Sequence, residues 1–61
     1  MKVSEMIKKL KQAGCYKTDE GSKHDQWYSP KTGKYFMVPR HQSKELATGT
    51  ANQIMKDAGL K

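Results

Sequence analysis

The segment HDQWYSPKTGKYFMVP, residues 24–39, decides the fold. Two six-residue runs, His24 to Ser29 and Lys34 to Pro39, hold aromatic and β-branched residues typical of strands, and a Pro-Lys-Thr-Gly sequence typical of turns separates them. We predict an antiparallel hairpin. Its four-residue loop places Ser29 opposite Lys34, and this sets the register of the two strands.

This register divides the hairpin into two faces, because successive side chains of a strand point to opposite sides. Trp27 lies opposite Phe36 and Asp25 opposite Val38, and the apolar members of this face are expected in the core. The more polar face should remain uncovered by helices. It carries His24, Gln26, Tyr28, Tyr35 and Met37.

Two amphipathic segments flank the hairpin. Apolar residues recur at helical spacing from about Ser4 to Ala13, with Ser4 as candidate N-cap and Gly14 as the stop. A second set of apolar residues, from Ala51 to Ala58, has the same spacing and predicts a second helix. Its candidate N-cap is Thr48 or Thr50, and its stop is Gly59. Cys15 to Asp19 forms a further predicted strand, and the polar connection of residues 40–49 has Leu46 as its apolar anchor.

The predicted order is therefore α-β-β-β-α in one domain, residues 1–61. Each helix has a single apolar stripe, so the α+β fold places both helices on one face of a three-stranded antiparallel sheet. A domain this short has no room for a deep pocket, and we expect its chemistry on an open surface.

Charge favours a polyanionic partner, because 12 Lys and Arg stand against 6 Asp and Glu for a net charge of +6. Lysines interrupt the N-terminal apolar run, and no stretch approaches the ~18 apolar residues of a membrane span. We expect a soluble chain with no signal peptide and no membrane association. The single cysteine, Cys15, excludes an internal disulfide and fits the cytoplasm; we expect it packed in the core.

His24 is the first candidate for chemistry, because an imidazole both takes and gives a proton near neutral pH. RNA cleavage needs this ability: the ribose 2′-hydroxyl loses a proton, the departing 5′-oxygen gains one, and nearby cations stabilise the phosphorane. DNA lacks that hydroxyl, so the chemistry would be confined to RNA. The plain alternative is an exposed histidine with no role.

Further residues are candidates for contact with RNA. His41 should lie near the His24 end of the sheet as an auxiliary or substrate-contacting residue, and Lys23, Lys34 and Arg40 near the same edge as phosphate contacts. Lys44 follows in the connection. Tyr28 and Tyr35 face each other and could stack unpaired bases, or merely stabilise the sheet.

The alternative function of a metal site would use four residues whose types can bind a metal ion: Cys15, His24, Asp25 and His41. These residues have no Cys-x-x-Cys, His-x-x-x-His or clustered carboxylate spacing, so no metal or other cofactor is predicted.

Together these features resemble the HicA toxin family over nearly the whole chain. The resemblance rests on the element order and on short segments in sequence: Gly21-Ser22-Lys23-His24 with Trp27, Val38-Pro39-Arg40-His41, Lys44-Glu45-Leu46, and the closing helix from Gly49-Thr50 to Ala58-Gly59-Leu60. In many relatives further histidines follow the Gly-Ser-x-His segment, whereas Asp25 and Gln26 occupy those places here.

The resemblance implies a double-stranded-RNA-binding-domain-like fold and a type II toxin that inhibits translation by cleaving mRNA without a metal or the ribosome. It also implies that His24 is catalytic and that a HicB antitoxin covers the active site. Two alternatives come from the residues alone: a non-catalytic RNA-binding module, and a protein-interaction domain for an acidic partner.

Overall fold

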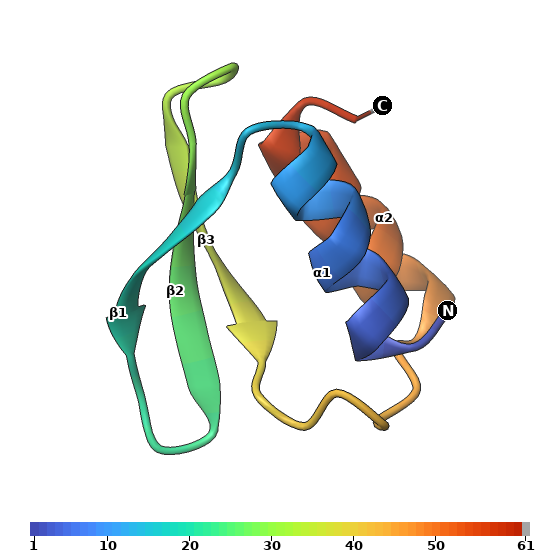
Figure 1. Ribbon diagram of the computed structural model, residues 1–61. Coiled ribbons are helices and arrows are strands. Elements are labelled where there is room, and N and C mark those ends of the chain that lie inside the picture. Colours follow the sequence, from blue (N-terminus) through green and yellow to red (C-terminus); the bar gives the residue numbers. More distant parts are fainter. Residues whose placement is uncertain (61) are drawn as a thin grey trace.

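The computed structural model describes residues 1–60 and has the predicted α-β-β-β-α order (Figure 1). The elements, in chain order, are α1 (Val3–Gln12), β1 (Tyr16–Glu20), β2 (His24–Ser29), β3 (Lys34–Pro39) and α2 (Thr48–Ala58). The α+β fold class is confirmed, and the order agrees with a double-stranded-RNA-binding-domain-like fold.

The hairpin of β2 and β3 has the predicted register at every pair, from His24 opposite Pro39 to Ser29 opposite Lys34. The Gly33 N–H donates a hydrogen bond to the Ser29 carbonyl at 2.7 Å and closes the loop. β1 pairs antiparallel with the other side of β2, so the sheet order is β1-β2-β3. A bulge interrupts β1, because the register shifts between Lys17 and Asp19.

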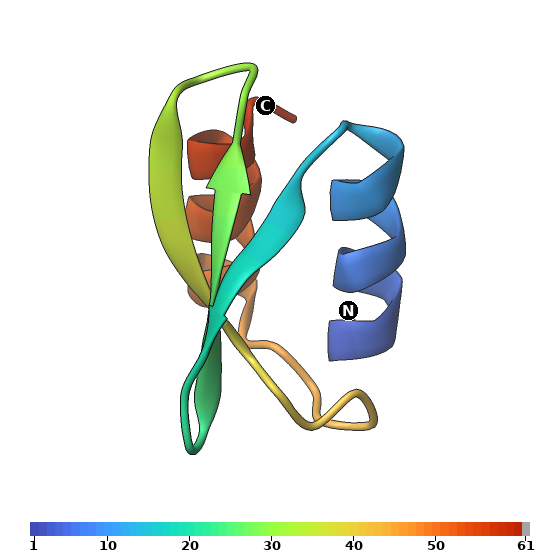
Figure 2. The ribbon, with the colours of Figure 1, turned by 60° about the vertical axis from the view of Figure 1, so that its left-hand side comes forward.

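Both helices lie on one side of the sheet, with α2 behind β2 and β3 in Figure 2. The sheet contributes Trp27, Phe36 and Val38 to the core, as predicted, and Leu46 anchors the connection between β3 and α2. The other buried apolar side chains come from the helices and from the residue that leads into β1: Val3, Met6, Leu10, Cys15, Ala51, Ile54 and Ala58. The opposite face of the sheet is therefore the uncovered one.

The start of α1 differs from the prediction. Lys2, not Ser4, is the N-cap, and its side chain makes no capping hydrogen bond. Carbonyls of the polar connection accept the free N–H groups of the first turn instead: Val3 donates to Lys44 at 2.9 Å and Ser4 to Gln42 at 3.0 Å. The first turn of α1 is thus capped by a distant part of the chain.

The start of α2 also differs, because Ala47 is the N-cap and neither Thr48 nor Thr50 holds that position. Its end is as predicted: Gly59 has φ 83°, in the left-handed region that favours glycine, and donates to the carbonyl of Lys56 at 3.2 Å.

The first strand begins one residue later than predicted, at Tyr16. The Cys15 N–H donates to the Leu10 carbonyl at 2.9 Å, and the Gly14 N–H to the Lys11 carbonyl at 3.1 Å. These two bonds form the Schellman motif that ends a helix, so the backbone of Cys15 belongs to the end of α1. Its side chain is buried, as expected.

Hydroxyl groups of the hairpin bind the last carbonyls of α2. The buried Ser29 donates from Oγ to the Ala58 carbonyl at 2.8 Å, and Thr32 donates from Oγ1 to the Asp57 carbonyl at 2.5 Å. These bonds attach the end of α2 to the hairpin. The end of the hairpin opposite His24 is therefore fastened to the core.

Candidate active site

His24 is the first residue of β2 and is exposed on the uncovered face of the sheet, as predicted. Its carbonyl accepts a hydrogen bond from the Gly21 N–H at 2.9 Å, and the preceding carbonyl of Lys23 accepts one from the Arg40 N–H at 3.1 Å. The backbone on both sides of the β1–β2 turn is thus fixed, while the imidazole faces solvent.

Gly21 makes this turn possible because its backbone lies against His24. A Cβ atom at position 21 would overlap the His24 carbonyl oxygen at a separation that real Cβ contacts do not show. Any other residue here would have to displace backbone rather than a flexible side chain. The position of His24 therefore depends on glycine at residue 21.

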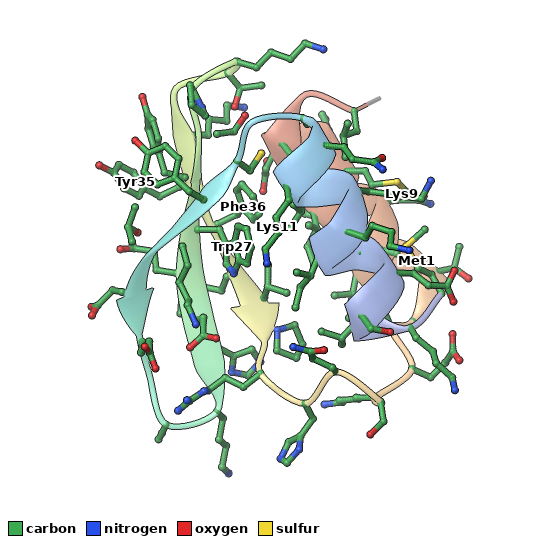
Figure 3. All side chains as sticks on the ribbon, viewed as in Figure 1. Met1, Lys9, Lys11, Trp27, Tyr35 and Phe36 are labelled. Carbon is green, nitrogen blue, oxygen red and sulfur yellow. The ribbon has the colours of Figure 1, made fainter. Side chains whose placement is uncertain are left out.

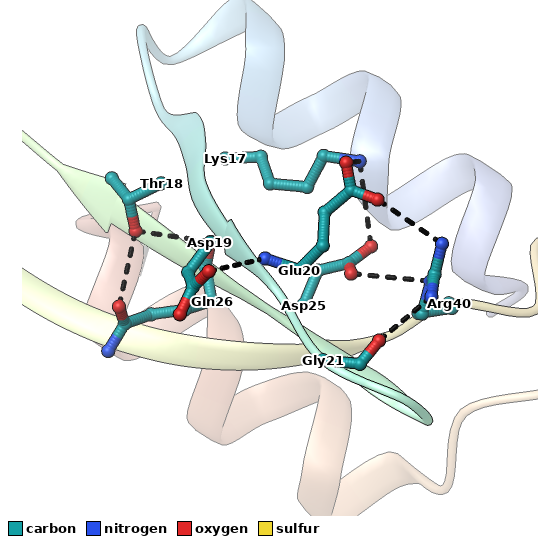
Figure 4. Close-up of polar contacts among 8 residues, drawn as sticks. All are labelled: Lys17, Thr18, Asp19, Glu20, Gly21, Asp25, Gln26 and Arg40. Atoms are coloured by element: carbon teal, nitrogen blue, oxygen red, sulfur yellow. Dashed lines mark hydrogen bonds and ion pairs between the residues drawn. The ribbon is translucent and has the colours of Figure 1, made fainter.

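The guanidinium of Arg40 lies beside Asp25, on the helix-covered side of the sheet (Figure 4). His24 faces the other side. Nη1 donates to the Gly21 carbonyl at 2.8 Å, Nη2 lies 3.3 Å from Glu20 Oε2, and Nε lies 3.4 Å from Asp25 Oδ1. The side chain thereby joins the end of β3 to the β1–β2 turn. Arg40 is at the predicted end of the sheet, but its charge is paired with carboxylates on the face away from His24.

Asp25 lies on the helix face, so it forms no couple with the adjacent His24. Only 8% of the residue is exposed. Its Oδ2 lies 3.7 Å from Lys17 Nζ, and Lys17 Nζ also lies 3.9 Å from Glu20 Oε1. Lys17, Glu20, Asp25 and Arg40 therefore form one ionic cluster, in which two cations balance two carboxylates.

The remaining cationic candidates are exposed but not gathered at one point. Lys23 precedes His24 in the turn, and His41 and Lys44 lie just beyond β3, where the Lys44 N–H donates to the His41 carbonyl at 3.1 Å. The expectation that Lys34 lies near the His24 edge is wrong. Lys34 pairs with Ser29 at the other end of the hairpin. At ~3.3 Å per residue this is roughly 17 Å along the strands from His24, because one strand separates the two ends.

Three tyrosines form a row across the uncovered face. The ring centroids of Tyr28 and Tyr35 are 4.8 Å apart, which confirms that the two residues face each other. Tyr16 of β1 adds a third ring, 5.7 Å from Tyr28. Tyr35 is 60% exposed, and Figure 3 shows it pointing away from the helices. We call Tyr16, Tyr28 and Tyr35 the tyrosine row.

Sequence reasoning missed Tyr16 because it left the pairing of the first strand open. The bulge at β1 shifts the register by one residue, so simple alternation along residues 15–19 does not reveal it. The cationic side chains of Lys11 and Lys17 on the helix face were also missed. Only the tertiary arrangement brings them near Asp25.

Within residues 1–60, no group of three or more His, Cys, Asp or Glu side chains is placed to hold a metal ion. In the same range, no helix has the length and apolar character needed to cross a bilayer.

These features describe a small basic α+β domain with an exposed histidine at the start of the central strand of its sheet. Residues 3–60 match the family model described as the HicA toxin of bacterial toxin-antitoxin systems, and the chain belongs to this family. It is thus the toxin component of a toxin–antitoxin system, for which the family implies an antitoxin partner. No curated protein and no solved structure matches the chain.

Proposed function

We propose that this toxin is a metal-independent endoribonuclease that cleaves mRNA with His24 as the catalytic residue and so inhibits translation. The observation that carries the proposal is the exposure of His24 on the uncovered face of the sheet, held by a turn whose backbone is fixed. A rigid main chain beneath an accessible imidazole suits proton transfer, which requires a well-defined approach to the substrate.

The proposed reaction is an internal transfer at one phosphodiester. His24 accepts the proton of a ribose 2′-hydroxyl, the 2′-oxygen bonds to the adjacent phosphorus, and the bond to the 5′-oxygen breaks. The products are a 2′,3′-cyclic phosphate and a 5′-hydroxyl end, whose oxygen takes a proton from water while His24 returns its own proton to the solvent. His41 is assigned the auxiliary role, and the exposed ammonium groups of Lys23 and Lys44 are assigned to phosphates.

The tyrosine row supports RNA as the substrate. It lies on the same face as His24, and its exposed rings are suited to stacking on unpaired bases. The net charge of +6 supports an RNA partner in the same way, because phosphate contacts dominate the affinity of such proteins. Lys34, at the other end of the hairpin, alternates with Tyr35 and so lies on the helix side of the strand, and it is assigned to phosphates of RNA that passes beyond that end of the hairpin. The Arg40 N–H bonds to the Lys23 carbonyl beside the site, whereas the Arg40 guanidinium pairs with carboxylates on the helix face.

We further propose that the antitoxin is a HicB-like protein that covers His24 and that both act in the cytoplasm, where mRNA is found. Covering the tyrosine row would bury three exposed apolar side chains of this face, Tyr16, Tyr35 and Met37. Added antitoxin should then displace RNA from the toxin. An antitoxin complex that binds RNA as tightly as free toxin would contradict this arrangement.

The test is cleavage of a defined RNA in the presence of EDTA. His24→Ala should lower the rate by about 10²- to 10⁴-fold, the range typical of one general acid or base, while RNA binding persists. His41→Ala is the matched control because it removes the chain's only other histidine, and its rate should fall less. Cleavage at the original rate in His24→Ala would refute the assignment. Binding without any cleavage by the wild type would indicate an RNA-binding module instead.

A further inference from the structure

A hollow lies between α1 and the sheet, on the face opposite His24, and the proposed chemistry does not use it. Its volume is about 370 Å³, within the range of sites that bind small molecules. Its walls combine apolar and charged side chains, which include Ile7, Lys11, Cys15, Lys17, Asp25, Trp27 and Arg40. Figure 3 shows Lys11 of α1 and Trp27 of β2 in this region.

Asp25 gives the hollow an unused hydrogen-bond acceptor. Its Oδ1 is buried and has no hydrogen-bond partner within residues 1–60, although Arg40 Nε balances its charge from 3.4 Å. A buried carboxylate oxygen without a hydrogen bond is costly, because it has lost its contact with water. A ligand that draws Lys17 and Arg40 away from Asp25 and presents N–H or O–H groups in their place would remove this cost.

The hollow also attracts an anion, because Lys11 adds a third cation to Lys17 and Arg40, which Asp25 and Glu20 already balance. A simple anion would satisfy these cations but would be repelled by Asp25. A ligand with both an anionic group and a donor edge fits both requirements. If the anionic group is a phosphate, it would then replace Asp25 as the partner of Lys17 and Arg40.

The remaining wall selects a flat ring. Trp27, Ile7 and Cys15 present apolar surface, and a nucleobase combines such a surface with hydrogen-bonding groups at its edge. Guanine alone among the four RNA bases offers two adjacent N–H donors, N1–H and the N2 amino group. A carboxylate accepts two parallel bonds from such a pair. Adenine and cytosine place an acceptor beside their donor, which would face Asp25 unfavourably.

We propose that this hollow is a guanine-binding subsite for RNA, with Asp25 reading the base and Lys11, Lys17 and Arg40 holding a phosphate. The inference rests on the proposed function, since it assigns a base preference to the same substrate. Asp25 directly follows His24, so their Cα atoms are about 3.8 Å apart while their side chains lie on opposite faces. An RNA strand that passes over the β1–β2 turn reaches both.

The experiment measures binding of guanosine, inosine and adenosine 5′-monophosphates to the His24→Ala variant by the fluorescence of Trp27, the chain's one tryptophan. We expect the guanosine nucleotide to bind about tenfold or more tightly than the adenosine nucleotide, with inosine between them because it lacks the N2 amino group. Asp25→Asn should reduce the guanosine affinity to that of adenosine. Glu20→Gln is the matched control, because it removes a carboxylate that pairs with Arg40 but does not line the hollow, and it should keep the preference.

Equal binding of the three nucleotides, or equal competition by inorganic phosphate, would reduce the hollow to an anion site and overturn the proposal. A preference lost equally in Glu20→Gln would overturn the role of Asp25. Inosine tests the base contact in the unaltered cleft, so the result stands even if Asp25→Asn does not fold. Mononucleotides contain no bond to cleave, so these outcomes are separate from the question of whether His24 is catalytic.

Discussion

The buried hydroxyl of Ser29 shows how one side chain holds two elements together. Ser29 is fully buried and donates to the Ala58 carbonyl at 2.8 Å. Ser29→Ala would leave that carbonyl buried without this partner, so the free energy of unfolding should fall by roughly 1–3 kcal/mol. Urea denaturation followed by circular dichroism measures the change. Ser43→Ala, at an exposed serine, is the control and should change stability little. Equal effects of the two substitutions would contradict the role of the buried bond.

Gly21 is a single residue on which the activity should depend. A methyl group there would overlap the His24 carbonyl oxygen, so Gly21→Ala must displace the turn that carries the imidazole. We expect RNA cleavage to fall by about 10²-fold, because misplacement of a reacting group by about 1 Å has effects of this size. The backbone amide signals of residues 20–25 should shift in NMR spectra. Gly49→Ala is the control, because nothing lies near a Cβ atom at that position. Normal activity of Gly21→Ala would contradict the proposed dependence.

Residues whose role follows from strand alternation were predictable, whereas those that depend on tertiary contacts were not. The exposed His24 and the buried Trp27 follow from alternation within one hairpin. Ser4 has the residue type of an N-cap, yet the connection supplies carbonyls to that turn and Lys2 takes the position. Arg40 stands at the predicted end of the sheet, but the carboxylates of Glu20 and Asp25 hold its guanidinium on the helix face, and no local pattern indicated that pairing.

At the scale of elements, loop length explains which strands could be aligned from sequence. The four-residue loop between β2 and β3 sets their pairing, and the predicted register is confirmed throughout. The pairing of β1 depends on a bulge at Thr18, where the side-chain hydroxyl lies 3.3 Å from the Gln26 carbonyl oxygen. No local sequence signal distinguishes this bulge from regular alternation, so the third ring of the tyrosine row went unrecognised.

The tyrosine row spans all three strands, so its role in binding can be tested on one ring. Tyr35→Ala should weaken binding of a single-stranded oligonucleotide about fivefold or more, because stacking on an aromatic side chain contributes ~1–3 kcal/mol per base. Tyr35→Phe keeps the ring and should bind like the wild type in a fluorescence anisotropy titration. Lys56→Ala, on α2, is the control for a change elsewhere on the surface. If Tyr35→Phe weakened binding as much as Tyr35→Ala, the hydroxyl rather than stacking would be responsible.

For the whole molecule, the residues before α1 and the connection before α2 form a closure that joins the starts of the two helices. Lys2 forms a β-bridge with Glu45, the Leu46 N–H donates to the Met1 carbonyl at 2.8 Å, and the Met1 ammonium forms an ion pair with the Glu45 carboxylate. Sequence analysis identified Leu46 as the anchor of this connection but not the partner of its backbone. That partner lies more than forty residues away in the chain, where local patterns carry no information.

This closure predicts a specific dependence of stability on pH. The hydrogen bond between the two groups raises the pKa of the Met1 ammonium above 8.0 and lowers the pKa of Glu45 below 4.5. Because the pKa of the Met1 ammonium is raised, this group contributes stability that is fully present below pH 8.0 and is lost as pH rises through its folded-state pKa. Because the pKa of the Glu45 carboxyl is lowered, this group contributes stability that is fully present above pH 4.5 and is lost as pH falls through its folded-state pKa. The pair therefore stabilises the fold mainly between these two values.

We expect Glu45→Gln to lower the melting temperature slightly near neutral pH, because the pair is exposed and such pairs are weak. The difference from wild type should shrink as pH falls below 4.5 through the folded-state pKa of Glu45, and again as pH rises above 8.0 through that of the Met1 ammonium, because one partner of the pair then loses its charge. Acetylation of Met1 removes the other charge, so the acetylated Glu45→Gln protein should be no less stable than either single change. A difference that stayed constant from acid to alkaline pH would show that the charge of Glu45 does not stabilise the closure.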